Sequence, residues 1–281
     1  MKIHNAIIGL EEVFRDGFTI KKWKAYARAI HPELEALCLR DMEECIGSGN
    51  YTFEQNFLPI LRAALEDRDG RNEIINSFEE TTDHLDERLL SCFGRSVDVE
   101  VILYLGLCSG AGWVTEMEGR SVILLGTEKI LELGWGGLQA MYGLIYHELG
   151  HVYQGQYGVL HRILEGRQKF LWQLFTEGIA MVFEQILVGN TQFFHQDRDG
   201  WLDWCDAHFE EIKRDFTADL NIMDVKNQRW FGDWVFYHGH ADVGYYLGAR
   251  FVRFICDRYA FNEILSFDIL QVEAIFDEFT A

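Results

Sequence analysis

The spacing of apolar residues changes twice along the chain. Residues 1 to about 95 repeat apolar side chains every three or four positions, which is typical of amphipathic helices. Residues 99–105 and 121–125 are instead short apolar runs rich in β-branched residues, and glycines separate them, so they predict a small antiparallel β-sheet. After about residue 136 the helical spacing returns and predicts four helices, over roughly 137–156, 165–188, 201–220 and 243–260. Helices, a small sheet and further helices together indicate an α+β fold that is mostly helical.

The same pattern indicates where the chain divides. No internal repeat, low-complexity segment or proline-rich linker interrupts it. The composition shifts towards β-branched residues near residue 97. We therefore predict a helical N-terminal segment over residues 1–95 and a second domain over residues 96–281.

One of the predicted helices contains a candidate metal motif. His147 and His151 lie four residues apart, so on a helix they are separated by about 40° of rotation and about 6 Å of rise, and both imidazoles face one point. Two neutral imidazoles at this spacing suit a tetrahedral zinc ion. Glu148 is rotated away from that point, where a carboxylate can take a proton from water rather than bind the ion. The apolar residues of 138–152 form one stripe, which predicts that the helix faces a core.

A catalytic zinc site needs a third protein ligand and one open position. Glu177 is the best candidate, because it is one of two carboxylates in an almost wholly apolar helix, where an unpaired carboxylate is costly to bury. His161 and Glu165 are weaker candidates, since both follow the expected end of the motif's helix. Glu184 lies two turns after Glu177, and it is either an orienting partner of a ligand histidine or, as we prefer, a solvated helix end.

Small residues beside these candidates predict close helix packing. Glycines occur every seven residues, at 136, 143 and 150, and each interior glycine costs a helix about 1 kcal/mol. We therefore expect another backbone to approach along this flank, and the alternative for Gly136 is that it belongs to the start of the helix. Gly178 and Ala180 remove bulk beside Glu177, so we expect that helix to approach the helix of the motif.

The segments His-Glu-Leu-Gly-His at 147–151 and Thr-Glu-Gly-Ile-Ala at 176–180 resemble the gluzincin metallopeptidases. The resemblance implies a helical zinc-binding lobe in which His147, His151 and Glu177 bind one Zn²⁺. It also implies that the carboxylate of the first segment, Glu148, is the catalytic base.

Residues 245–248, Tyr-Tyr-Leu-Gly, are similar to the Tyr-x-x-Gly segment of the aminopeptidase branch of that clan. This likeness implies that Tyr245 stabilises the oxyanion, with Tyr246 as its rival. His238 and His240 are further candidates for the donor. The Gly-x-Met-Glu-Asn segment with which that branch recognises a free α-amine is absent.

Charge and cysteine content limit the classes of partner and the cellular compartment that we expect. The net charge of −20, from 25 basic and 45 acidic side chains, repels nucleic acid and anionic membranes, so we expect neither as a partner. The N-terminus lacks the apolar stretch of a signal peptide, and we expect no membrane-spanning run of roughly 18 apolar residues. The six cysteines form no Cys-x-x-Cys pair, which is typical of free thiols in a reducing compartment. We therefore predict a cytoplasmic protein.

Together these features predict a zinc-dependent metallopeptidase that acts on a peptide or protein substrate, with Glu148 as general base. An extended substrate would pair with residues 119–125 if that run is an edge strand. The aromatic loop 222–242 would form a wall or lid of the cleft. The alternative is a catalytically inactive zinc-binding interaction protein with a peptidase-like fold. The presence of Glu148 argues against it, because structural zinc sites need no base.

Overall fold

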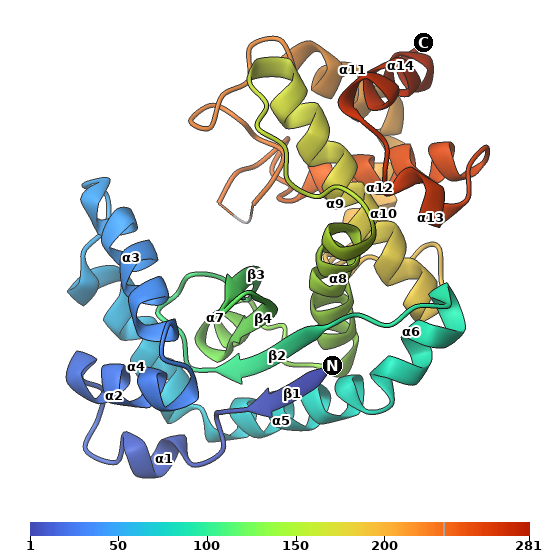
Figure 1. Cartoon of the computed structure of the whole chain (residues 1–281). Coiled ribbons are helices and arrows are strands. Elements are labelled where there is room, and N and C mark those ends of the chain that lie inside the picture. The colour runs from blue at the N-terminus through green and yellow to red at the C-terminus, as the bar shows by residue number, and fades with distance from the viewer. Residues whose placement is uncertain (233) are drawn as a thin grey trace. The chain divides into compact units, whose positions relative to one another are not determined.

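The computed structural model describes residues 1–232 and 234–281 (Figure 1). The chain forms two compact units. The first consists of Met1–Leu90 and Ser96–Glu148, and the second of Ser91–Arg95 and Leu149–Ala281. This grouping differs from the predicted division after residue 95, because the N-terminal helices and the sheet pack together in one unit.

The first unit contains a four-stranded sheet in the order β1-β2-β4-β3. Its strands are β1 (Lys2–Asn5), β2 (Val99–Tyr104), β3 (Gly112–Met117) and β4 (Arg120–Gly126). β1 and β4 both pair parallel to β2, and only β3 and β4 pair antiparallel. The prediction of an antiparallel sheet is therefore wrong outside this hairpin. The chain leaves β2, forms the outer strand β3 first and then returns between β3 and β2, which makes β4 parallel to β2.

Most helices of the first unit lie between β1 and β2 in the sequence, and one follows β4. They are α1 (Leu10–Val13), α2 (Ile20–Ile30), α3 (Leu34–Gly47), the π-helical turn η1 (Phe53–Phe57), α4 (Leu58–Glu66), α5 (Arg68–Thr82), α6 (Leu85–Phe93) and α7 (Thr127–Glu132). Every residue of β2 is buried. Trp23 of α2 donates its indole N–H to the carbonyl of Leu105, 2.8 Å away, and this bond holds α2 to the loop that follows β2.

The second unit is helical. α8 (Leu138–Tyr157) leads into it, followed by α9 (Gly166–Val188), α10 (Trp201–Ala207), α11 (Phe209–Asp219), α12 (Val243–Cys256), α13 (Phe261–Ile264) and α14 (Ile269–Thr280). The single helix predicted over 201–220 is thus two, which meet at His208. α9 packs against both α12 and α14. The predicted fold class, α+β and mostly helical, is confirmed.

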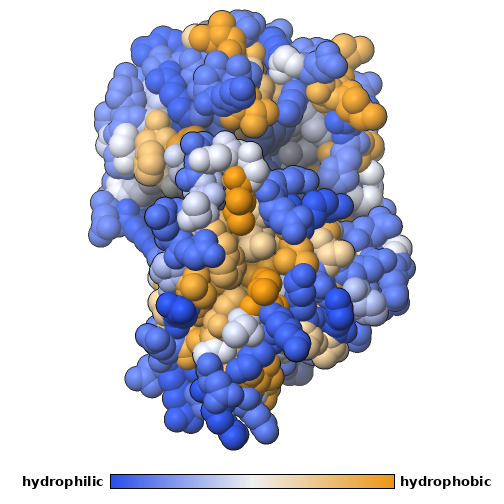
Figure 2. Space-filling view, turned by 90° about the vertical axis from the view of Figure 1, so that its left-hand side faces the viewer, coloured by the Kyte–Doolittle hydropathy of each residue, from blue (hydrophilic) through white to orange (hydrophobic). Residues whose placement is uncertain are grey.

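Among the described residues, α9 alone is long and apolar enough to cross a membrane by length and composition, although the sequence led us to expect no such run. In its most apolar window 78% of the residues are buried within the protein. The core helix of a globular fold has the same properties, so this finding is weak evidence for a membrane span. Hydrophilic side chains cover most of the face drawn in Figure 2, with apolar patches between them.

Candidate metal centre

One continuous helix carries both candidate histidines. The boundary between the two units falls inside α8, between Glu148 and Leu149, and the helix continues through it. His147 and Glu148 are buried, with 6% and 8% of their surfaces exposed, and His151 is half-buried. The four-residue spacing therefore places the two imidazoles one helical turn apart, as the sequence predicts.

The structure brings His147, His151 and Glu177 together. Their ligand atoms all lie within 4.8 Å of one another. Nε2 of His151 is 3.2 Å from Oε2 of Glu177, and two ligand atoms of a tetrahedral zinc ion lie about 3.3 Å apart when each bond is about 2.05 Å. Two imidazoles and one carboxylate also form a donor set of catalytic zinc sites. The residues present therefore fit a zinc ion.

Close backbone contact sets the approach of α8 to α9. A Cβ added to Gly150 would lie 2.7 Å from Cα of Ala180. Gly150 directly precedes His151, and Ala180 lies three residues after Glu177. This contact therefore lies within about one helical turn of both ligands and keeps them close to each other. The predicted close approach of a backbone is confirmed at Gly150. A Cβ on Gly136 would instead meet the side chain of Ile74, at 3.2 Å.

Gly178 permits the close packing of a different helix from the one we expected. A Cβ there would overlap the carbonyl oxygen of Gly248 in α12 and lie 2.6 Å from its carbonyl carbon. The reciprocal Cβ on Gly248 would lie 2.7 Å from the carbonyl oxygen of Leu174. The expectation that Gly178 admits α8 is wrong, because this side of α9 is occupied by α12. The crossing joins the residue after Glu177 to a residue one turn after Tyr245.

The two candidate tyrosines have different surroundings. Tyr246 is buried and donates its hydroxyl hydrogen to Asp206, at 2.7 Å. Burial raises the pKa of Tyr246, and the bond to Asp206 raises it further. Tyr245 is half-buried in the first turn of α12, with its ring 5.7 Å from that of Phe231. The hydroxyl of Tyr246 is thus engaged by Asp206 in the core.

Glu184 is not the solvated helix end that we preferred. Its side chain is fully buried, and Oε2 lies 2.9 Å from Nδ1 of His195. His195 is also almost fully buried. The preference was wrong because α9 continues through the core to Val188, beyond the point where a solvated end was expected. Nothing in the sequence marks His195, since it is a single histidine outside any motif.

The two weaker ligand candidates do not belong to the group formed by His147, His151 and Glu177. His161 and Glu165 are both exposed in the connection between α8 and α9. Neither belongs to a group of metal-ligating atoms among the residues that the structure describes.

The edge strand beside Glu148 is also not the predicted one. Residues 119–125 fall almost wholly in β4, which lies between β2 and β3, so the expectation of an edge strand there is wrong. β3 is the edge strand next to β4, and a Cβ on its first residue, Gly112, would lie 3.2 Å from Cγ of Glu148. The glycines between the two apolar runs predicted only turns, and the contact of Gly112 with Glu148 was not expected from the sequence.

The histidines of loop 222–242 lie in a tight turn. Tyr237 and His240 exchange two backbone hydrogen bonds, and His238 at the tip has a φ of 49°. His240 stacks on Trp204 with ring centroids 4.0 Å apart. Burial lowers the pKa of His240, and nearby histidines lower it further. His238 forms a second group of potential ligand atoms with Glu211 and Asp215 of α11.

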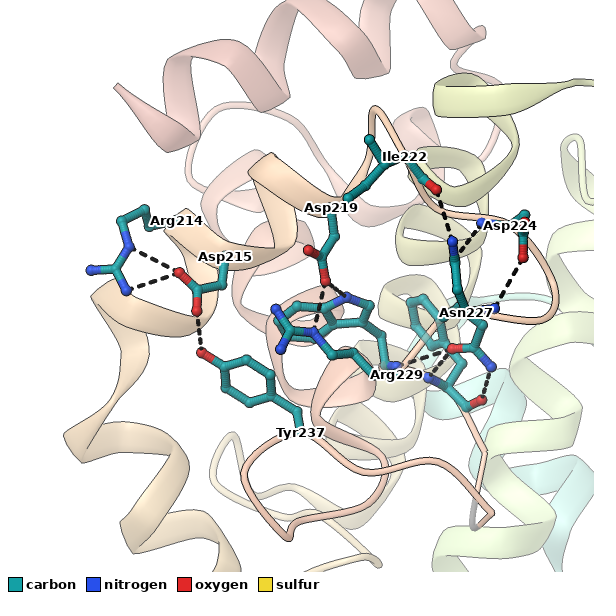
Figure 3. A network of polar contacts seen from close by, with 11 residues as sticks. Arg214, Asp215, Asp219, Ile222, Asp224, Asn227, Arg229 and Tyr237 are labelled. Atoms are coloured by element: carbon teal, nitrogen blue, oxygen red, sulfur yellow. Dashed lines mark hydrogen bonds and ion pairs between the residues drawn. The ribbon is translucent and has the colours of Figure 1, made fainter.

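Two aspartates of α11 hold this loop (Figure 3). Asp219 accepts hydrogen bonds from Nε of Arg229, at 2.8 Å, and from the indole of Trp230, at 2.9 Å. Asp215 accepts from the hydroxyl of Tyr237, at 3.0 Å. Asp233, within the predicted lid, lies outside the described residues. The loop is therefore fastened to α11 at two points.

No protein-family model matches the chain, and the comparisons with curated proteins and with solved structures find no match. The likeness to gluzincins consequently rests on residues 147–151, 176–180 and 245–248 themselves.

Proposed function

We propose that the chain is a zinc-dependent metallopeptidase, in which His147, His151 and Glu177 are the zinc ligands and Glu148 is the general base. The observation that carries the proposal is the convergence of two imidazoles and one carboxylate within 4.8 Å. A carboxylate that lies next to a ligand in sequence, and is buried, adds the base that hydrolysis requires. A structural zinc site would need a fourth protein ligand and no base.

A bound zinc ion would supply Lewis-acid polarisation of a water molecule and of the scissile carbonyl. Glu148 takes the proton from the attacking water and delivers it to the leaving amine. Its burial limits the access of bulk water to this transfer. Tyr245 donates a hydrogen bond to the oxyanion, and one such donor contributes about 3–4 kcal/mol.

The substrate is a peptide or protein that pairs with β3. The amide of Gly126 donates to the carbonyl of Ala111, so the N–H and C=O groups of Gly112, Val114 and Glu116 point away from β4. An extended peptide can pair with this row by β-augmentation. Because a Cβ on Gly112 would lie 3.2 Å from Cγ of Glu148, the row begins beside the base. The acidic chain and its free cysteines support a cytoplasmic setting, with no nucleic acid or membrane as partner.

Metal analysis combined with peptide turnover tests the proposal. The purified chain should contain one zinc ion, and Glu148→Gln should keep the zinc and lose cleavage of a mixed peptide library. His147→Ala and Glu177→Ala should lose the zinc. Glu165→Gln, in an exposed carboxylate at the start of α9, is the matched control and should retain both properties.

A chain without stoichiometric zinc would refute the proposal. Stoichiometric zinc without cleavage of any peptide would favour the inactive interaction protein instead. Equal turnover in the wild type and in Glu148→Gln would show that the base is misassigned.

A further inference from the structure

Gly112 is packed against the proposed base more tightly than a side chain would permit. A Cβ at this position would lie 2.7 Å from Cδ1 of Leu144, 3.2 Å from Cγ of Glu148 and 3.3 Å from Oε1 of Glu148. Leu144 and Glu148 are one turn apart on α8, and both are buried. The backbone of β3 therefore forms a wall against this face of α8.

The loop before Gly112 is held in place by other contacts. Glu128 of α7 is buried and accepts hydrogen bonds from the backbone N–H of Gly106, at 2.7 Å, and of Cys108, at 2.9 Å. A Cβ on Gly126 would lie 2.6 Å from the carbonyl oxygen of Gly110. The loop thus has little freedom to retreat if the contact at Gly112 grows.

We infer that Gly112 is a positioning residue for Glu148: its missing side chain lets β3 confine the carboxylate to one orientation beside the ligand histidines. The inference rests on the proposed function. Because φ at Gly112 is not in the left-handed region, alanine fits the backbone conformation, and only the space against α8 forbids it. A methyl group there first displaces the terminal methyl of Leu144, and the contacts at 3.2 and 3.3 Å then displace the strand or the Glu148 side chain, while the zinc ligands stay on their helices.

The experiment compares Gly112→Ala with Gly110→Ala. Gly110 lies two residues earlier in the same loop, and a Cβ there would be in ordinary contact, 3.4 Å from the carbonyl oxygen of Gly112. For Gly112→Ala we expect kcat to fall by about tenfold, because the contacts at 3.2 and 3.3 Å displace Glu148 by a few tenths of an ångström, and a misplacement near 1 Å costs about 100-fold. KM and the zinc content should stay within about threefold of wild type, since neither depends on the base. Gly110→Ala should match the wild type in all three.

A second measurement reads the contact without turnover. In protein labelled at the leucine methyl groups, Gly112→Ala should shift the NMR signals of Leu144, and Gly110→Ala should leave them in place. The double variant Gly112→Ala/Leu144→Val removes the tightest overlap and should recover part of the lost kcat. It also keeps the inference testable if the single variant folds poorly.

The outcomes separate the inference from the function. A Gly112→Ala protein with kcat within about twofold of an active wild type would overturn the inference and leave the peptidase standing. Loss of zinc from Gly112→Ala would also overturn it, since the glycine would then act through the metal site. A wild type that binds zinc and cleaves nothing would refute both, although the Leu144 signals would still report the contact.

Discussion

Gly178→Ala is the sharpest test of the helix crossing beside the proposed metal ligand Glu177. The substitution adds one methyl group where the nearest atoms belong to the backbone of Gly248, so no side-chain rotation can relieve the overlap. The added Cβ would lie 2.6 Å from the carbonyl carbon, and ordinary contacts begin at 3.4 Å. The two helices must therefore separate by at least about 0.8 Å, and gaps of this size lose a quarter to a half of the dispersion energy of the contacts they open.

Overpacking of this kind costs about 3 kcal/mol when the neighbour is backbone. The better helix propensity of alanine returns about 1 kcal/mol. The net loss of about 2 kcal/mol should lower Tm by about 4–8 °C in a chain of this size. Zinc affinity should fall as well, since Glu177 moves with the helix.

Calorimetry of the purified variant measures the Tm, and chelator competition measures the zinc affinity. The matched control is Gly155→Ala in α8, where the nearest atom to the added Cβ is 3.8 Å away. Free of overlap, that variant should gain about 0.5–1 kcal/mol from helix propensity. If Gly178→Ala is as stable as Gly155→Ala, the two backbones are not in contact and the reasoning about the crossing is wrong.

Three further predictions follow from other contacts. Tyr245→Phe should lower kcat by about 100-fold at unchanged KM, whereas Tyr246→Phe should keep kcat and lose about 1 kcal/mol of stability with its buried hydrogen bond; equal kcat in both would exclude an oxyanion role for Tyr245. His195→Ala should cost about 3 kcal/mol in urea unfolding, because it breaks the buried pair with Glu184, and a cost below about 1 kcal/mol would mean that the pair behaves as an exposed one. Asp219→Ala should make loop 222–242 more sensitive to limited proteolysis. An unchanged cleavage pattern would show that the hydrogen bonds of Asp219 do not hold the loop in place.

The sequence alone determined the features that depend on local spacing. The helical repeat around residues 138–152 and the four-residue spacing of the histidines follow from the geometry of a single helix. The same holds for the broad order of helices and strands, and so for the fold class. The choice of Glu177 over His161 also followed from local pattern, because a carboxylate in an apolar helix needs a partner.

What depends on contacts between distant segments was decided only by the tertiary structure. The strand order could not be read from the sequence, because β4 inserts beside β2 through pairings that local patterns do not encode, and the short strand Lys2–Asn5 joins only through its partner. The same reason explains Glu184, whose partner is the distant His195, and Gly178, which meets α12 instead of α8. A glycine or a buried carboxylate in a helix predicts a closely packed neighbour. Only the packing of the whole chain decides which residue that neighbour is.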